Sequence, residues 1–351
     1  MTVHIRESLA SLPAYIPGRS IPGAIKLASN EVAGGPLPSV QAVIAEAAGS
    51  VNRYPDMGAV TLIDRIAGAA GVDPDRVAVG CGSVSLCQQL IQATCEGPAD
   101  EVLFGWRSFE AYPIITQVVG AGRVMVPLTP DHGLDPKAMA AAVTERTRVV
   151  FVCNPNNPTG SVWRRAELER FLDAMPDTVV VALDEAYREF VTDPEVPDGL
   201  TLLPGRPNVV VLRTFSKAYG LAGLRVGYAV AAPELIAALR KVCIPFSVNA
   251  VAQAAAIASL DAADELLARC GQVCKERERV RAALMSVGFE VPPSQANFVW
   301  LPLGDKTDEF NRHCLEQKVV VRAFTGDGAR VTIGASEDND ALLSAALSYE
   351  G

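Results

Sequence analysis

The sequence has little histidine, an excess of acidic over basic residues and no long apolar run. Its three histidines, His4, His132 and His313, are far apart, and no two of its eight cysteines have C-x-x-C spacing. A zinc site needs several such ligands at short, regular spacing. No metal site is therefore expected, and the cysteines are interpreted as small buried residues of a protein in a reducing compartment.

The charge balance and the hydropathy pattern exclude further classes of protein. The 31 Lys and Arg against 40 Asp and Glu leave a net charge of −9. This balance argues against a nucleic-acid or anionic-membrane partner, because both need a basic surface. No apolar run reaches the roughly 18 residues of a membrane span, and residues 1–18 lack the basic and apolar regions of a signal peptide. We therefore expect a cytoplasmic protein.

The sequence does contain a regular alternation of short Val-rich runs and helical patterns between residues 76 and 231. The runs are apolar on both faces, as in strands that helices cover on both sides of a sheet. This layout predicts an α/β fold with a mostly parallel seven-stranded sheet. The expected strands span 76–80, 101–105, 123–128, 148–154, 178–184, 208–214 and 225–231, and helical patterns between them span 86–95, 135–143 and 165–175.

After Pro233 the pattern changes to that of a smaller α+β domain. A helix is expected over 233–242, and a longer one over 262–288. The charged residues from Lys275 to Arg281 on the longer helix are interpreted as a solvent-exposed face. Further strands are expected over 297–303, 319–324 and 330–335, with helices around 308–318 and 338–348.

The first 30 residues are rich in Pro and Gly and predict an arm instead of a domain. We divide the chain into an N-terminal arm over 1–30 that joins the small domain, a large domain over 31–240 and a small domain over 241–351.

Polar residues gather where four of the expected strands end. In open α/β sheets, ligands bind outside the carboxyl ends of the strands. "GCGSVSL" at 80–86 combines glycines with a helix start, which can bind an anion but is more often only a cap. "CNPNNPTG" at 153–160 is a rigid turn that can hold an asparagine amide against a ligand, or be only a loop.

The other two clusters carry charge. Asp184 and Glu185 end an apolar run, and leaving a buried carboxylate unpaired costs several kcal/mol, roughly 2–7. Its partner can be a cationic ring nitrogen or a salt bridge to a neighbouring strand, and this stretch alone leaves both open. Lys217 follows a strand, near Thr214 and Ser216. A desolvated lysine is readily deprotonated and can form a Schiff base, whereas a lysine that extends into solvent has no such role.

Considered together, the four clusters favour a cofactor site. A lysine, a strand-end aspartate, a strand-end asparagine and several phosphate-binding groups are what an enzyme needs to hold pyridoxal phosphate. The lysine binds the aldehyde carbon. The aspartate keeps the ring nitrogen protonated, so that the ring can accept electrons from the substrate's Cα.

At these residues the sequence resembles the fold-type I pyridoxal-phosphate-dependent aminotransferases, over almost the whole chain. "NPNNPTG", "DEAY" and "TFSKAYGLAGLRVGY" occur in the order and at the spacing of that family. The sequence is most similar to the histidinol-phosphate aminotransferase-like branch. Within that branch, "LPAYIPG", "IKLASNE", "NRYPD" and "GCGSVSLCQQL" resemble the actinobacterial aromatic amino acid aminotransferases. The resemblance implies the fold-type I architecture, pyridoxal 5′-phosphate as cofactor and a homodimer with shared active sites.

The resemblance also implies roles for individual residues around the cofactor. Lys217 would be the Schiff-base lysine and would carry the proton between the substrate's Cα and the cofactor. Asp184 would pair with the pyridine nitrogen, and Asn157 and Tyr187 would hold the phenolic oxygen. Phe109 would stack on the ring, where many relatives have Tyr. The phosphate would be bound by Ser83, the backbone of Val84, Thr214, Ser216, Arg225 and, from the neighbouring subunit, Tyr54.

On the substrate side, the resemblance implies that Arg330 clamps the carboxylate and that Asn30, Tyr15 and Asn157 line the pocket. Arg322 has a counterpart in histidinol-phosphate enzymes, where it helps to bind the substrate phosphate. One departure is that many relatives read G-S-D-E after the glycine turn, whereas this chain has Val84 where they have Asp. Backbone contacts to the phosphate are expected to remain, but a side-chain role is not.

The function expected from the resemblance is the transfer of an amino group between an aromatic amino acid and 2-oxoglutarate. The alternative within the same chemistry is histidinol phosphate as amino donor. A β-lyase or a decarboxylase can share this scaffold. A ligand-sensing module of a regulator can share it too, but would bring a basic helix-turn-helix segment, and none is visible.

Overall fold

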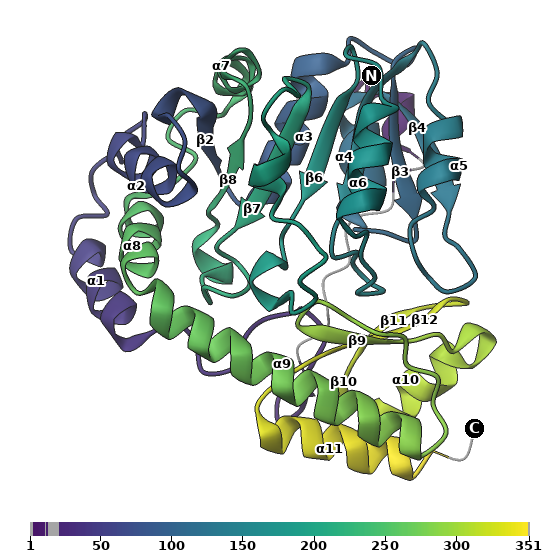
Figure 1. The fold of residues 1–351 in the computed structure, drawn as a ribbon. Coiled ribbons are helices and arrows are strands. Elements are labelled where there is room, and N and C mark those ends of the chain that lie inside the picture. Colours follow the sequence, from purple (N-terminus) through teal and green to yellow (C-terminus); the bar gives the residue numbers. More distant parts are fainter. Residues whose placement is uncertain (1–2, 11, 13–20, 350–351) are drawn as a thin grey trace.

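The computed structural model describes residues 3–10, 12 and 21–349. Their largest element is a seven-stranded sheet with the strand order β2-β8-β7-β6-β5-β3-β4 (Figure 1). All neighbouring strands are parallel except β8, which is antiparallel to both β2 and β7. The predicted strands are therefore confirmed. They are β2 Val77–Gly80, β3 Glu101–Trp106, β4 Gly122–Pro127, β5 Thr147–Cys153, β6 Val180–Asp184, β7 Val209–Thr214 and β8 Gly227–Val230.

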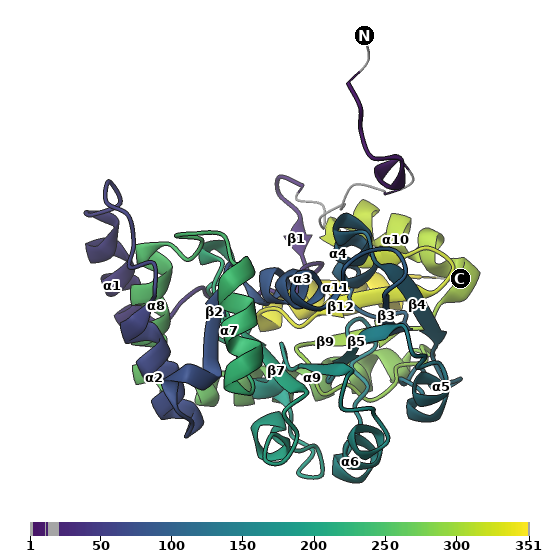
Figure 2. The same ribbon diagram turned by 90° about the horizontal axis from the view of Figure 1, so that it is seen from above.

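Helices cover both faces of this sheet, which explains why its strands are Val-rich on both sides (Figure 2). Along β5, Val149 and Phe151 belong to one apolar core, whereas Val150 and Val152 belong to the other. The first core lies under α3 Ser83–Thr94, α4 Ala111–Val119 and α7 Pro233–Val242. The second lies under α2 Val60–Ala70, α5 Pro136–Ala141, α6 Arg165–Asp173 and α8 Ala250–Asp261.

The register of the sheet brings several strand ends to one edge. Thr214, the last residue of β7, pairs with Gly227 at the start of β8, which in turn pairs with Gly80 at the end of β2. On the other side, Cys153 at the end of β5 pairs with Asp184 at the end of β6. The polar segments that follow these strands therefore meet in space.

A second layered unit lies at the C-terminal end of the chain. Its antiparallel sheet has the order β11-β12-β9, and a third apolar core fills the space between this sheet and its helices. Helix α9 runs from the large sheet to this unit (Figure 1). The elements are α9 Ala263–Ser286, β9 Phe298–Leu301, α10 Thr307–Glu316, β10 Val319–Val320, β11 Arg322–Phe324, β12 Gly328–Thr332 and α11 Ser336–Leu347.

The strand predicted over 319–324 is divided in the structure. Val319 and Val320 form β10, which pairs in parallel with β1 Ile25–Lys26, whereas Arg322 begins β11 and pairs with β12. The N-terminal segment thus joins the small unit through β1. The segment can do so because the chain re-enters the three-stranded sheet only at Arg322, so the backbone groups of β10 are available to another strand.

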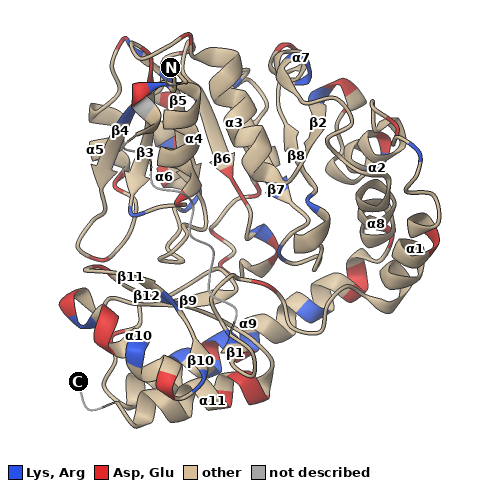
Figure 3. Ribbon diagram, turned by 180° about the vertical axis from the view of Figure 1, so that it is seen from behind, with Lys and Arg blue, Asp and Glu red and all other residues tan. Residues whose placement is uncertain are grey.

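One prediction about α9 is wrong. Lys, Arg, Asp and Glu residues follow one another along this helix (Figure 3), but Arg277 is only 1% exposed. Its Nη1 donates hydrogen bonds to the carbonyl oxygens of Phe190 and Ala296, at 3.1 and 3.0 Å. Arg277 faces inward because α9 packs on the 3-10 helix Arg188–Phe190 and on the loop before β9.

Helix α8 lies after residue 240, yet Ala252, Ala255 and Ala256 contribute to the core of the large sheet. It packs against α2 and against α1 Pro38–Ala48. The division of the chain at residue 240 remains a proposal, and this packing favours a boundary further along, within α9. In the part of the chain that the structure describes, no helix is both long and apolar enough to cross a bilayer.

Candidate active site

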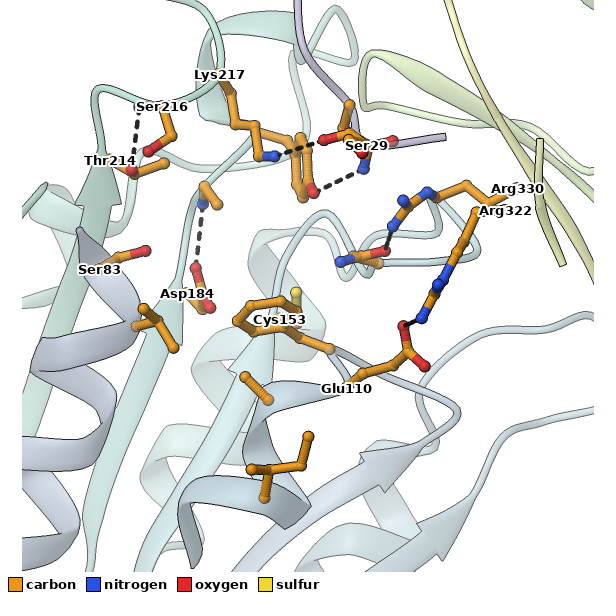
Figure 4. Close-up of a pocket in the computed structure, with 18 of the residues that line it drawn as sticks. Ser29, Ser83, Glu110, Cys153, Asp184, Thr214, Ser216, Lys217, Arg322 and Arg330 are labelled. Carbon is orange, nitrogen blue, oxygen red and sulfur yellow. Dashed lines mark hydrogen bonds and ion pairs between the residues drawn. The ribbon is translucent and has the colours of Figure 1, made fainter. Parts of the chain in front are cut away.

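The polar segments at the sheet edge enclose a cavity of about 410 Å³. It lies between the large sheet and the strands of the small unit (Figure 4). Thirteen of the fifteen site residues predicted from the sequence line it. The exceptions are Tyr54, which lies elsewhere on the surface, and Tyr15, which lies outside the described residues.

Lys217 extends into the cavity instead of into solvent. Its Nζ donates a hydrogen bond to the carbonyl oxygen of Ser29 at 3.1 Å (Figure 4). Desolvation lowers the pKa of its amine to about 7, and the positive charges of Arg330 and Arg225 act in the same direction. A substantial fraction of this amine is therefore neutral near neutral pH and can act as a base or a nucleophile.

The two carboxylates at the end of β6 have different environments. Glu185 forms an ion pair with Arg213 of β7 at 2.7 Å, so the salt-bridge alternative applies to this residue. Asp184 points to the other side of the strand and is 2% exposed. Within residues 21–349 no ion pair involves Asp184 directly, and burial raises the pKa of its carboxyl.

Asp184 accepts two hydrogen bonds from this chain. Its Oδ2 accepts from the hydroxyl of Tyr112 at 2.6 Å, and its Oδ1 accepts from the backbone N–H of Ala186 at 3.3 Å. A carboxylate in this setting is suited to a cationic partner supplied by a ligand, because the desolvation cost of the carboxylate is then offset.

Tyr187 and Asn157 lie on the side of the cavity nearer the small unit. The hydroxyl of Tyr187 accepts a hydrogen bond from Asn30 Nδ2 at 2.9 Å. Asn157 Oδ1 accepts from Arg330 Nη1 at 2.5 Å. The other polar atom of the Asn157 side chain is the amide nitrogen, which is a hydrogen-bond donor. Phe109 also lines the cavity, with its ring edge-on to Tyr112 at 5.4 Å between centroids.

A cluster of anion-binding groups lies at the start of α3. This helix begins at Ser83 without a side-chain cap, and its free N–H groups point toward the cavity end lined by Thr214, Ser216 and Arg225. Arg225 Nη1 donates to Ser216 Oγ at 3.1 Å. Together a helix N-terminus, two hydroxyls and a guanidinium are suited to a phosphate group.

Two arginines from the small unit reach the cavity. Arg330 is 7% exposed, and its Nη2 donates to the carbonyl oxygen of Ala28 at 2.7 Å. Arg322 Nη2 forms an ion pair with Glu110 Oε2, also at 2.7 Å (Figure 4). The contacts that hold Arg330 at the cavity wall include two neutral acceptors, and Arg322 is neutralised by a carboxylate.

Tyr54 is 83% exposed and packs on Phe246, with 4.6 Å between the ring centroids. It does not line the cavity of its own chain.

Residues 22–346 match the family model described as "Aminotransferase class I and II". The chain belongs to the aminotransferase class I and II family. Curated relatives of this aminotransferase include the aromatic amino acid aminotransferase of Rhodococcus jostii, which is 61% identical over 350 residues that cover 100% of this chain and 97% of the relative. The protein of the same name from Mycobacteroides abscessus is 58% identical over 343 residues, which cover 98% of each chain.

Solved structures with the same fold include histidinol-phosphate aminotransferase from Sinorhizobium meliloti in complex with pyridoxal-5′-phosphate. The TM-score is 0.89 and the identity 29%, with 99% of this chain and 97% of the other covered. The fold-type I architecture of this aminotransferase is thereby confirmed.

Sequence reasoning missed several residues of this aminotransferase that contact the predicted set, among them Glu110 and Tyr112. Glu110 directly follows Phe109, and Tyr112 lies three residues after Phe109. Their position next to a predicted site residue was the available indication. Their partners, Arg322 and Asp184, are 212 and 72 residues away in sequence, so no local pattern could reveal the contacts.

Proposed function

We propose that this chain is a pyridoxal-phosphate-dependent aminotransferase that moves the amino group between an aromatic amino acid and 2-oxoglutarate. The observation that carries the proposal is that one cavity holds both Lys217, an amine whose pKa is lowered to about 7, and Asp184, a buried carboxylate that forms no direct ion pair within residues 21–349. The name of the relatives at 58 and 61% identity supports the substrate class.

The residues of the cavity fit the cofactor group by group. Lys217 suits an aldehyde, Asp184 suits a protonated ring nitrogen, and the start of α3 with Arg225 suits a phosphate. The amide of Asn157 and the hydroxyl of Tyr187 suit the phenolic oxygen. When bound, pyridoxal phosphate supplies an aldehyde that takes up the amino group and a ring that withdraws electrons from Cα.

The chain's own groups then move protons and hold the substrate. Lys217, in its neutral form, accepts the proton from the substrate's Cα as a general base and returns it as a general acid. Asp184 keeps the proton on the ring nitrogen. Arg330, with donors on a planar fork, binds the α-carboxylate shared by both substrates.

Lys217→Ala tests the proposal. We expect the purified variant to lose both turnover and the visible absorbance of the lysine-bound cofactor, because Lys217 is the only lysine among the described residues that line the cavity. Lys241→Ala is the matched control, since Lys241 is exposed on α7 far from the cavity. A Lys217→Ala variant that turned over at the normal rate would remove the lysine from this role.

A second candidate is histidinol phosphate as amino donor, supported by the structural similarity to the Sinorhizobium meliloti enzyme. The ion pair between Arg322 and Glu110 argues for the aromatic substrate. A phosphate beside Arg322 would have to displace or neighbour the Glu110 carboxylate, and two anions close together repel each other.

Glu110→Gln measures this effect. We expect the ratio of kcat/KM for histidinol phosphate to that for phenylalanine to rise about tenfold, because removal of a like charge at a few ångströms is worth about 1.4 kcal/mol in a partly desolvated site. If the wild-type ratio already favours histidinol phosphate, the second candidate replaces the first.

We also propose a homodimer with shared active sites, in which Tyr54 reaches the phosphate of the neighbouring subunit. The 83% exposure of an aromatic ring next to Phe246 supports a partner surface there. The eight free cysteines suit the cytoplasm, where we place the protein.

A further inference from the structure

Tyr112 lies behind the cavity and has no role in the function proposed above. It belongs to α4, is 0% exposed and does not line the cavity. Its hydroxyl donates to Asp184 Oδ2 at 2.6 Å, the length of a charge-assisted O–H···O⁻ bond. The bond from Ala186 to the other carboxyl oxygen is longer, at 3.3 Å. In the described chain, Tyr112 is therefore the strongest hydrogen-bond partner of Asp184.

Packing holds the Tyr112 ring in this position. The ring stacks on Phe151 with 4.5 Å between centroids and an interplanar angle of 9°. Phe109 meets it edge-on from the cavity side, at 5.4 Å. The hydroxyl is therefore held rigidly at the carboxylate, and the same ring supports the residue expected to stack on the cofactor.

In the pair formed by Tyr112 and Asp184, the negative charge lies on Asp184. Burial raises the pKa of the Tyr112 hydroxyl well above its usual value, and the charge of Asp184 raises it further. Cys87 on α3 and Cys153 on β5 face the pair, and burial raises the pKa of both thiols. The positive charge of Lys217 acts on Asp184 and lowers the pKa of its carboxyl.

The hydrogen bond from Tyr112 opposes the effect of burial on Asp184. Burial raises the pKa of the carboxyl, whereas Tyr112, Ala186 and Lys217 lower it. Without the hydroxyl, the carboxyl would take up a proton at higher pH. A protonated carboxyl offers no charge to a protonated ring nitrogen.

We propose that Tyr112 is a positioning residue that keeps Asp184 ionised and correctly oriented for the pyridine nitrogen of the cofactor. The inference rests on the proposed function, because it assumes that Asp184 pairs with that nitrogen. Tyr112 acts through Asp184 and does not touch the cofactor.

The test compares the binding of two cofactors to the full-length apoprotein. One is pyridoxal phosphate, and the other is its 1-deaza analogue, in which a C–H group replaces the ring nitrogen. The dissociation constant of the analogue divided by that of pyridoxal phosphate reports on the contact to the nitrogen. The contributions of Lys217 and of the phosphate site cancel in this ratio. In Tyr112→Phe, which keeps the ring and its stacking, we expect this ratio to fall about tenfold or more, mainly through weaker binding of pyridoxal phosphate.

The pH dependence of the ratio gives a second readout. The preference for pyridoxal phosphate is lost as the pH falls through the pKa of Asp184, and in Tyr112→Phe this loss should begin at a higher pH. A 3-fluorotyrosine placed at position 112 donates more strongly and should move the loss to a lower pH, which keeps the test decisive if Tyr112→Phe does not fold. Tyr228→Phe is the control, because it removes another buried hydroxyl of the large-sheet region without touching Asp184.

The outcomes separate the two proposals. If wild-type protein binds both cofactors equally, Asp184 does not pair with the nitrogen and the proposed function loses its support. If the wild type prefers pyridoxal phosphate and the Tyr112 variants keep the same ratio and pH profile, the proposed role of Tyr112 is wrong. Equal weakening of both cofactors would show a purely structural role and would also overturn it.

Discussion

At the scale of single residues, environment decides what chemically similar groups can do. Asp184 and Glu185 are neighbours in sequence and are both buried. Glu185 forms an ion pair with Arg213, whereas Asp184 accepts hydrogen bonds and forms no direct ion pair within residues 21–349. Environment also distinguishes Lys217 from the exposed lysines. Its amine is buried, and desolvation lowers the pKa of this amine to about 7. In the proposed function, the cofactor completes the environments of Asp184 and Lys217.

The pKa of Lys217 predicts the pH dependence of turnover. In the proposed mechanism the neutral amine is the base, and the neutral form is lost as the pH falls through about 7. We expect kcat to be flat above this value and to fall about tenfold per pH unit below it. The measurement is a pH profile recorded with two substrates, one with deuterium and one with hydrogen at Cα. A slower rate with the deuterated substrate confirms that proton transfer limits the rate. A profile that stays flat to about pH 5 would contradict the assignment of the base.

At the scale of elements, the proposed phosphate-binding region depends on the close approach of β8 to the start of α3. A side chain on Gly227 would place its Cβ 2.5 Å from the backbone nitrogen of Ser83 and 2.8 Å from the carbonyl oxygen of Arg213. Both neighbours are backbone atoms of an α-helix and a strand, so neither can move by itself. Gly227 thus sets how near the helix N-terminus lies to Thr214 and Arg225.

Gly227→Ala tests this dependence. We expect the helix start to shift, with at least about a tenfold loss of affinity for pyridoxal phosphate and a lower Tm. Binding of pyridoxal, which lacks the phosphate, should change much less. Gly223→Ala is the control, because a Cβ there meets no atom within 4 Å. Equal losses for both ligands would mean that the change is not specific to the phosphate region.

At the scale of the whole molecule, the cavity is complete only when distant parts of the chain come together. Ser29 accepts the hydrogen bond of Lys217, and Asn30 donates to Tyr187. Asn30 is also held by Thr332 of β12, at 3.0 Å between Thr332 Oγ1 and Asn30 Oδ1. The N-terminal segment therefore links the large sheet to the small unit at the site.

The proposed homodimer predicts complementation between two inactive proteins. Lys217→Ala lacks the lysine and Tyr54→Ala lacks the residue donated across the interface. After mixing and exchange of subunits, half of the dimers carry one site with both residues intact, so activity should recover to about a quarter of the wild-type value. Sedimentation should give a mass of two 37.1 kDa chains. A monomer, or a mixture that stays inactive despite exchange, would contradict shared sites.

The sequence predicted the strands and most of the cavity because both depend on local patterns. Val-rich runs identify strands that are covered on two faces, and polar residues directly after them identify the ligand-binding edge. It missed the contacts of Glu110 and Tyr112, and it assigned Arg277 to the solvent, because these depend on which elements pack together. The division of 319–324 between two sheets was missed for the same reason.

The amino-acid sequence by itself determined the order of strands and helices along the chain and the kinds of group at each strand end, since side-chain periodicity and turn chemistry act over a few residues. Only the tertiary structure decided which of these groups are desolvated, paired or left without a partner. Burial and distance set the pKa of Lys217, the burial of Asp184 without a direct ion pair among the described residues, and the neutralisation of Arg322. Both are properties of segments that meet in space across tens to hundreds of residues.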